Sequence, residues 1–390
     1  MERNVAALIA FNAFRGAAVG GMMALFTLYM SWLGYSMSDI GVAITASNMV
    51  SVATLPLIGY LIDVYSPRLM AFATGIMLSL ALIILTMQPS YIILIAAYSL
   101  FLLSFFYGQP ARMSFLAKSI SLSTLGSSIG VTSAVFSASR TIGPTLGGYS
   151  AETIGFKDTF LILSILALLG SFVFLALSRE PAGFKRQKAT FAGVVRSYKT
   201  LLKPPESVRK VFLYVGMDRF AWSLWFPMIS AHLYTNGYQE SLVGLVLSAQ
   251  SLVQSIALPL TGRLVDVMGP RISLASSEIV GVGSALLLSN PESPVIAFTA
   301  MILLGFSIAL WIPGYNTLIA GIVGRGEVGR YYASANVYRS IASTPSPYIG
   351  GTLYDALSHT APFILSSILF VALAYYILVY IRNPSGLGKA

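Results

Sequence analysis

The chain has 390 residues, of which 56% are hydrophobic and only 10% are charged, and its mean hydropathy is +0.77. Because a soluble domain carries roughly 25% charged residues, this composition excludes an ordinary soluble fold and favours a bilayer, whose lipid solvates an apolar exterior. The net charge of +10 arises from basic residues in loops between apolar stretches, which is typical of membrane proteins and argues against nucleic-acid binding.

Twelve mostly apolar stretches follow one another along the chain, each about 20 residues long and therefore long enough to cross a bilayer as a helix. Polar residues, proline and glycine separate them, as in Gln88-Pro89-Ser90. We predict an all-α membrane protein with twelve transmembrane helices in two six-helix halves. The predicted spans cover residues 5–33, 40–62, 69–88, 91–116, 128–151, 158–179, 210–234, 241–262, 272–289, 295–321, 331–354 and 360–381.

A basic segment, residues 181–209, separates the sixth span from the seventh. The loops on the same side of the predicted membrane hold most of the 24 lysines and arginines, and the opposite loops are mainly acidic. Cytoplasmic loops are enriched in lysine and arginine, so we predict a multi-pass protein of the plasma membrane with both termini in the cytoplasm. The predicted domains are an N-terminal half (1–180), a cytoplasmic linker (181–209) and a C-terminal half (210–390).

The second half of the chain repeats the first with a constant shift of 203 residues. The shift carries residues 59–63 onto residues 262–266, and no gap is needed between residues 34 and 148. Between residues 34 and 68, 15 of the 35 aligned pairs are identical, which indicates a duplication. Two similar halves in the same order suit an alternating-access transporter, because a site at their interface can open to either side of the membrane.

The loop after the second span resembles the signature loop of the major facilitator superfamily, and a copy follows the eighth span, where that family repeats the motif. The first copy departs from the family pattern at Val64, Ser66 and Pro67. The resemblance implies the fold of the superfamily and transport of a small molecule. It also implies a gating role for Gly59, Asp63 and Arg68 and for their counterparts Gly262, Asp266 and Arg271.

Asp63 and Asp266 stand at the predicted cytoplasmic ends of their helices, where a carboxylate can pair with a loop arginine or meet the positive N-terminus of a neighbouring helix. For Asp63, the resemblance suggests the start of span eleven as that partner, in a contact that forms when the cytoplasmic side shuts. A static salt bridge in the loop is the alternative. Asp63→Asn is therefore expected to lower transport in proteoliposomes while preserving membrane insertion, and an unchanged rate rejects the gating role.

A glycine-proline segment in span five resembles the family motif associated with antiporters, and span eleven contains a degenerate copy. Proline removes a backbone donor, and glycine allows close approach of helices. The segment predicts either a bend that takes part in the choice of transport direction or a tight packing surface. The motif residues are Gly143, Pro144, Gly147, Gly148, Pro347, Gly350 and Gly351, and the same two spans carry Arg140 and Arg339.

Charged residues inside the predicted spans are costly unless they are paired or hydrated, so they mark candidate sites. Arg15 and Arg219 stand at nearly equivalent places in the two halves, and two such arginines could clamp a carboxylate or phosphate group. Anion-exchanging members of the superfamily use a similar pair. Asp218 and Glu278 are the candidate proton carriers. Alternatively, Asp218 neutralises Arg219, and Arg112 extends toward the cytoplasmic membrane surface from the end of its helix. Arg140, Arg339 and Glu278 then belong to structural networks between helices.

Aromatic and polar side chains accompany these charges in spans one, four, seven and ten, which line the central cavity in the superfamily. Such a cavity suits amphipathic organic molecules, and ordinary packing is the alternative for many of these residues. Ser104 stands where span four of many proton-coupled members carries an arginine, so no proton-transfer role is assigned there. The predicted substrate-binding residues are Asn12, Arg15, Tyr107, Gln109, Arg112, Arg219, Trp222, Trp311, Tyr315 and Asn316.

The leading interpretation is a secondary active transporter that exports a small organic solute in exchange for protons. The alternative is an uptake or exchange carrier for organic anions that uses Arg15 and Arg219. An intramembrane enzyme with Asp63 and Asp266 as an acid dyad is disfavoured, because each acid stands at a loop edge near an arginine. With no cysteine and two histidines, we expect no metal, cofactor or disulfide. The expected partners are a small-molecule substrate, membrane lipid and protons, and we expect a monomer.

Overall fold

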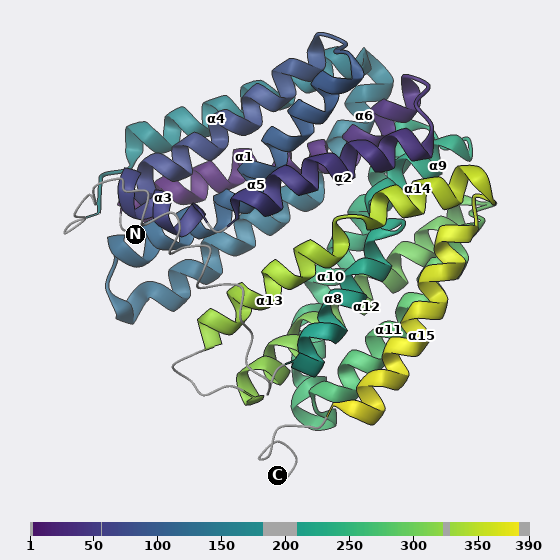
Figure 1. Cartoon of the computed structure of the whole chain (residues 1–390). Helices are drawn as coiled ribbons and strands as arrows, with labels where there is room; N and C mark the ends of the chain where they lie inside the picture. The colour runs from purple at the N-terminus through teal and green to yellow at the C-terminus, as the bar shows by residue number, and fades with distance from the viewer. Residues whose placement is uncertain (1–2, 56, 182–208, 323–327, 382–390) are drawn as a thin grey trace. The chain divides into compact units, whose positions relative to one another are not determined.

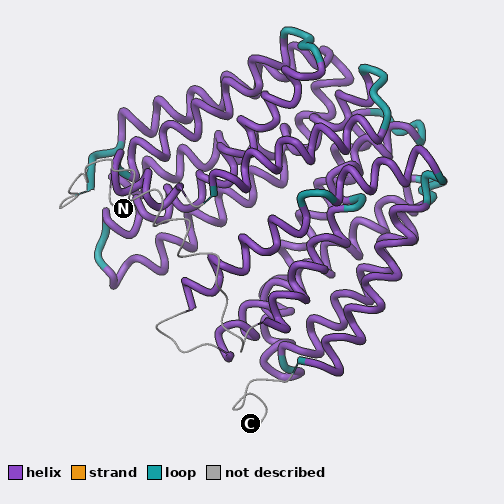
Figure 2. The backbone as a smooth tube through the Cα atoms, in the orientation of Figure 1, coloured by secondary structure: helices purple, strands orange, loops and turns teal. Residues whose placement is uncertain are grey.

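The computed structural model describes residues 3–55, 57–181, 209–322 and 328–381 (Figure 1). These described residues are almost wholly helical, with no strand among them (Figure 2). The predicted all-α architecture is therefore confirmed. Apart from its end residues, the predicted linker 181–209 lies outside the described part of the chain.

The helices run in chain order as α1 (Arg3–Trp32), α2 (Met37–Thr54), α3 (Leu57–Tyr65), α4 (Pro67–Thr86), α5 (Tyr91–Ser119), α6 (Leu122–Leu177), α8 (Arg209–Ser223), η2 (Phe226–Met228), α9 (Ile229–Thr235), α10 (Glu240–Met268), α11 (Pro270–Ser289), α12 (Pro294–Ile322), α13 (Val328–Ser343), α14 (Ser346–Ala356) and α15 (Ala361–Tyr380). The element η2 is a short 3₁₀ helix.

Eight of the described helices are long and apolar enough to cross a membrane: α1, α4, α5, α6, α10, α11, α12 and α15. Helix α6 covers two predicted spans, which join at Gly155 with a φ of 85°. The predicted spans two, seven and eleven are each divided among shorter helices. Pro227 in η2 and Pro345 before α14 lack the backbone N–H that would continue a helix. A multi-pass helical protein follows, and the count of twelve spans stays a prediction.

The chain divides into two compact units. Unit 1 contains residues 1–29, 46–200 and 239–245, and unit 2 contains residues 30–45, 201–238 and 246–390. The first part of α2 therefore belongs to unit 2, and the first residues of α10 belong to unit 1. The domain boundaries predicted from the sequence, at residues 180 and 210, stay a prediction.

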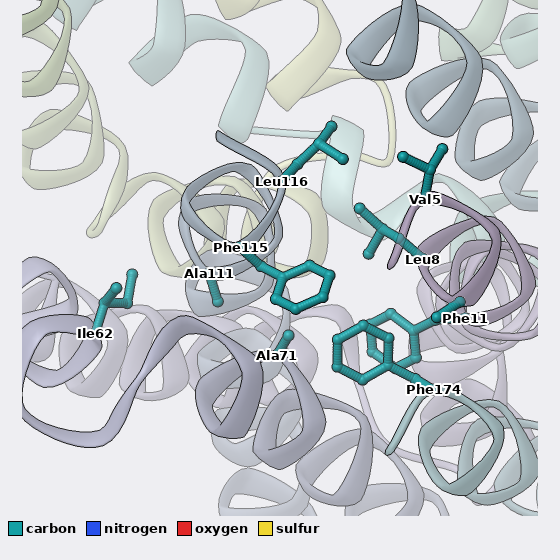
Figure 3. Close-up of a cluster of buried hydrophobic side chains, with 10 residues drawn as sticks. Val5, Leu8, Phe11, Ile62, Ala71, Ala111, Phe115, Leu116 and Phe174 are labelled. Atoms are coloured by element: carbon teal, nitrogen blue, oxygen red, sulfur yellow. The ribbon is translucent and has the colours of Figure 1, made fainter. Parts of the chain in front are cut away.

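In unit 1, α4 packs against α5 and α6, and a cluster of buried apolar side chains lies among these helices, α1 and α3 (Figure 3). Phe174 of α6 is central to it, because its ring centroid lies 5.1 Å from those of both Phe11 and Phe115. Helix association inside a membrane depends on such van der Waals packing, since lipid tails are as apolar as the side chains they replace.

In unit 2, α11 packs against α12 and α15, and α8 packs against α13 and α15. Small hydroxyl side chains connect these helices, and their bonds follow the repeat. Ser104 Oγ donates to the backbone oxygen of Thr74 at 2.6 Å in unit 1, and Ser307 Oγ donates to that of Ser277 at 2.8 Å in unit 2. Both pairs are related by the shift of 203 residues, so the duplication seen in the sequence extends to individual interhelical hydrogen bonds.

A second equivalent pair of contacts holds the first turns of α2 and α10. The backbone N–H of Ser38 donates to Asp355 Oδ2 at 2.6 Å within unit 2, and that of Ser241 donates to Glu152 Oε2 at 3.1 Å within unit 1. A carboxylate at a helix N-terminus satisfies a free backbone donor and the positive end of the helix dipole. The contacts join α2 to α14 and α10 to α6.

Candidate functional site

Two arginines and an asparagine gather inside unit 1, and we term Asn12, Arg15 and Arg112 the arginine cluster. Asn12 and Arg15 are three residues apart on α1 and share a face, and Arg112 comes from α5. Arg112 Nη1 donates to Asn12 Oδ1 at 3.0 Å, and Asn12 Nδ2 donates to the backbone oxygen of Thr132 at 2.8 Å. All three side chains of the cluster are buried, and Arg15 is 0% exposed.

The positive charge of the arginine cluster is not neutralised by any acid whose side chain the structure describes. Among the residues whose side chains are described, no carboxylate pairs with Arg15 or Arg112, and Arg15 Nε and Nη1 have no hydrogen-bond acceptor. The ring of Phe136 lies beside both cations, with its centroid 4.2 Å from Arg112 Cζ and 5.8 Å from Arg15 Cζ. A ring face compensates part of the lost hydration of a guanidinium, and the free N–H groups can still receive an oxyanion.

Two residues of α5 make room for Arg15. Its Nη2 donates to the backbone oxygen of Ser104 at 2.7 Å and to the hydroxyl of Ser104 at 3.2 Å. Gly108 lies one helical turn further, and a Cβ at this glycine would meet the guanidinium of Arg15. Ser104 of α5 thus binds the guanidinium group of Arg15 from α1. Gly108 has no side chain, and this leaves the space that the guanidinium group occupies.

A buried group of opposite character lies in unit 2, and we term Tyr214, Asp218, Glu278 and Arg339 the acidic cluster. Tyr214 and Asp218 are four residues apart on α8, so both face the same way. The hydroxyl of Tyr214 donates to Glu278 Oε1, and the carboxyl groups of Glu278 and Asp218 interact directly. Asp218 and Glu278 are 1% and 0% exposed, and no described residue donates to Asp218 Oδ1 or Glu278 Oε2. A pair of this kind can hold a shared proton.

Aromatic rings support the cationic member of the acidic cluster. Arg339 Cζ lies 4.4 Å from the ring centroid of Trp311 and 5.7 Å from that of Tyr315, and these two rings stack with centroids 4.6 Å apart. The charge of Arg339 also acts on Asp218. The predicted substrate residues Trp311 and Tyr315 therefore form a platform beside the buried carboxyl groups.

The remaining predicted substrate residues are Tyr107, Gln109, Trp222, Arg219 and Asn316, and of these Trp222 and Arg219 both act on Asp218 of the acidic cluster. The hydroxyl of Tyr107 donates to the backbone oxygen of Thr54 at 2.9 Å, and Trp222 packs on Phe370 with centroids 4.5 Å apart. Gln109, Asn316 and Arg219 are exposed. Arg15 and Arg219 belong to different units, so the predicted clamp by this pair stays a prediction.

The predicted gating residues are described only in part. Arg68 Nε donates to Ser178 Oγ at 2.9 Å, and its Nη2 donates to the backbone oxygen of Leu175 at 2.6 Å, so Arg68 joins the start of α4 to the end of α6. In unit 2, Asp266 is exposed near the end of α10, four residues after Gly262, and Arg271 stands in the first turn of α11. The side chain of Asp63 and the surroundings of Gly59 lie outside the described residues, and the gating role stays a prediction.

Glycines of the two glycine-proline segments lie against neighbouring backbones. A Cβ at Gly143 would overlap α1 at the backbone oxygen of Ala17, and one at Gly148 would overlap the backbone oxygen of Glu240 in α10. In unit 2, a Cβ at Gly350 would overlap Leu224, and one at Gly351 would overlap Met37 in α2. These observations support the tight-packing interpretation. Gly147, Pro144 and Pro347 are buried in the same two helices, and Arg140 is partly buried on α6.

Sequence reasoning missed four residues that complete these contacts: Phe136, Glu152, Tyr214 and Asp355. Tyr214 could have been found from its spacing, because it stands four residues before Asp218 on one helix face. Phe136 is equivalent to Arg339 under the shift of 203 residues, and Glu152 is equivalent to Asp355. The repeat was therefore the signal that connected them.

Comparisons with known proteins agree with this architecture. The family model described as Major Facilitator Superfamily matches residues 6–234 and 211–389. The multi-drug resistance efflux pump PmrA of Streptococcus pneumoniae serotype 4 is 23% identical over 387 residues, covering 95% of this chain and 94% of PmrA. The multidrug resistance protein MdtG of Dickeya zeae is 23% identical over 383 residues, covering 95% of this chain and 93% of MdtG.

A solved structure is also similar. The crystal structure of a mutant of the nucleoside transporter NupG matches with a TM-score of 0.76 and 11% sequence identity, covering 97% of this chain and 100% of that chain, which shows a common fold. The family model covers nearly the whole chain, and long apolar helices recur through the described residues. The protein therefore belongs to the Major Facilitator Superfamily and is a multi-pass membrane transporter.

Proposed function

We propose that this transporter exports small organic solutes in exchange for protons, by alternating access. The observation that carries the proposal is the acidic cluster, in which two buried carboxyl groups and a tyrosine hydroxyl interact on α8 and α11. The names of PmrA and MdtG, which describe a multi-drug resistance efflux pump and a multidrug resistance protein, support export and a substrate of the organic class.

The chemistry of the acidic cluster favours a proton as the coupled ion. Two ionised carboxylates side by side in a low-dielectric interior repel each other, and a single shared proton removes one charge and supplies the missing donor. Arg339 balances the charge that remains on the pair. Tyr214 donates its hydroxyl hydrogen to Glu278, which orients this carboxyl group within the pair. A proton taken up from one side and released to the other is the coupling step of an antiporter.

Transport of amphipathic dyes into proteoliposomes tests this function. A gradient of one pH unit supplies about 1.4 kcal/mol per proton, so exchange of one proton for one neutral solute is expected to accumulate the dye up to about tenfold. A dye distribution that stays equal on both sides with and without the gradient contradicts proton-coupled export. The same assay run with the gradient reversed tests the direction of transport.

The cellular arrangement belongs to the same proposal. We place the protein in the plasma membrane as a monomer, with both termini and the segment 181–209 in the cytoplasm. The support is the distribution of lysine and arginine among the loops, because cytoplasmic loops of membrane proteins are enriched in both.

A further inference from the structure

One equivalent position carries opposite charges in the two repeats, Arg15 in unit 1 and Asp218 in unit 2, and this difference points to the substrate. We infer that the arginine cluster of unit 1 binds an acidic group of the transported solute, a carboxylate or a phosphate-type oxyanion. The inference rests on the proposed transport of organic solutes and adds the chemical class of the group that is recognised. It concerns Arg15 with Arg112 inside unit 1, not Arg15 with Arg219.

The shift of 203 residues relates positions of the two clusters and of the rings beside them. It carries Arg15 onto Asp218, so a cation in unit 1 becomes an acid in unit 2. It also carries Arg112 onto Tyr315 and Phe136 onto Arg339. The contact between a guanidinium and a ring thus occurs in both units with its partners exchanged, Arg112 over Phe136 in unit 1 and Arg339 over Tyr315 in unit 2.

The shift also relates a second pair of neighbouring positions. The shift carries Phe11 onto Tyr214 and Gly75 onto Glu278. In unit 1 a Cβ at Gly75 would touch the ring of Phe11, and in unit 2 the hydroxyl of Tyr214 donates to Glu278. Residue 75, the unit 1 counterpart of Glu278, therefore carries no side chain, and Ser171 Oγ lies nearest to the place of the missing Cβ. At the positions equivalent to Asp218 and Glu278, unit 1 thus has a cation, Arg15, and a glycine, Gly75.

The energetic consequence differs between the units. In unit 2 the positive charges of Arg339 and Arg219 offset the charge of Asp218, while the two carboxylates, Asp218 and Glu278, repel each other when both are ionised. In unit 1 the two guanidinium groups lie close enough to repel each other, and no described carboxylate lies beside them. Buried cations without a partner ion are strongly disfavoured in a membrane interior. An oxyanion on the solute supplies this partner during transport.

The free donors in unit 1 suit such an oxyanion. Arg15 Nε and Nη1 are buried and have no acceptor in the described part of the chain, while Nη2 is anchored on Ser104. Asn12 holds Arg112 through Nη1, which fixes the second guanidinium next to the first. Hydrogen bonds between guanidinium groups and carboxylate or phosphate oxygens are charge-assisted and strong. The rings of Phe11 and Phe136 border Arg15 and offer apolar contacts to the organic part of the solute.

Binding of matched aromatic probes tests this inference. The purified protein in detergent is titrated with benzoate, benzamide and benzylamine, which share one ring and differ in charge, at constant ionic strength. Because a ligand stabilises the state that binds it, benzoate is expected to raise the melting temperature in a concentration-dependent manner, whereas benzamide and benzylamine leave it unchanged. Phenyl phosphate, compared with benzoate, shows which oxyanion is preferred. Equal effects of benzoate and benzamide, or none, overturn the inference without the need for a variant.

Variants locate the site. Arg112→Gln is expected to weaken benzoate binding at least tenfold, and Arg112→Lys, which keeps the charge but loses the planar fork, should weaken it less. Lys157→Gln removes an exposed cation of the same unit and is the matched control, with binding unchanged. Benzoate binding that survives Arg112→Gln and Arg112→Lys, or that is lost equally in Lys157→Gln, rejects the arginine cluster as the site.

The test separates this inference from the proposed function. Benzoate binding depends on unit 1 and is measured at one pH without a membrane gradient. Solute accumulation driven by a pH gradient is measured in proteoliposomes. If benzoate binds through Arg112 but no gradient drives transport, proton-coupled export fails and the anion site stands. If a gradient drives transport of neutral and cationic dyes and benzoate does not bind, the anion site fails and export stands.

Discussion

Replacing Glu278 by glutamine is expected to abolish accumulation of solute driven by a pH gradient, while counterflow of the same solute continues. Glutamine keeps the size and the hydrogen bond from Tyr214 but cannot take up or release a proton. Accumulation of the solute, which reaches about tenfold per pH unit in a coupled exchanger, should then fall to about onefold. Counterflow needs only binding and alternation, so its persistence shows that the variant is folded and moves.

Three further variants make this prediction specific. Asp218→Asn should act like Glu278→Gln, because both carboxyl groups belong to one proton-binding pair. Tyr214→Phe removes a donor to Glu278 and should change the pH dependence of transport without abolishing it. Glu292→Gln alters an exposed acid of unit 2 that accepts a hydrogen bond from Asn290 Nδ2. This control variant should leave accumulation of the solute intact. Full accumulation in the double variant Asp218→Asn, Glu278→Gln shows that another group carries the proton.

The helical fold could be read from the sequence because hydropathy acts over whole segments. Long apolar stretches fix where helices such as α4 and α12 stand, and the repeated loop after α3 and α10 fixes the correspondence between the halves. The breaks within predicted spans two, seven and eleven were less visible. They depend on single residues such as Pro227, and hydropathy averaged over about 20 residues does not register them.

The side-chain partners inside the bundle could be predicted only to a limited degree. Charge and burial marked Arg15, Arg112, Asp218 and Glu278 as candidates, because a charge within an apolar span needs an explanation. The partner of each charge lies on another helix, and helical periodicity fixes directions on one helix alone. The hydrogen bond from Arg15 to Ser104 is of this kind, because the two residues differ by 89 in residue number.

Introducing a methyl group at Gly148 is expected to slow transport and to lower the melting temperature. In Gly148→Ala, the new Cβ overlaps the backbone oxygen of Glu240, and neither helix backbone can yield without moving the other. Overpacking of this kind costs about 1–3 kcal/mol. The gain in helix propensity from glycine to alanine is at most about 1 kcal/mol, so the clash should dominate. Gly351→Ala should behave alike, because its Cβ overlaps the backbone oxygen of Met37 in unit 2.

A matched glycine separates packing from propensity. Gly126 lies on the same helix as Gly148, α6, but a Cβ there meets no atom within 4 Å, so Gly126→Ala should be as stable as the parent or more so.

The chain has no cysteine, and a single Ser241→Cys reporter in the first turn of α10 can therefore be alkylated selectively. The clash disfavours the state in which α10 lies on α6, by roughly 5- to 150-fold in population. Alkylation should accordingly be faster with Gly148→Ala and unchanged with Gly126→Ala, and equal rates in both would mean that this contact does not limit the transport cycle.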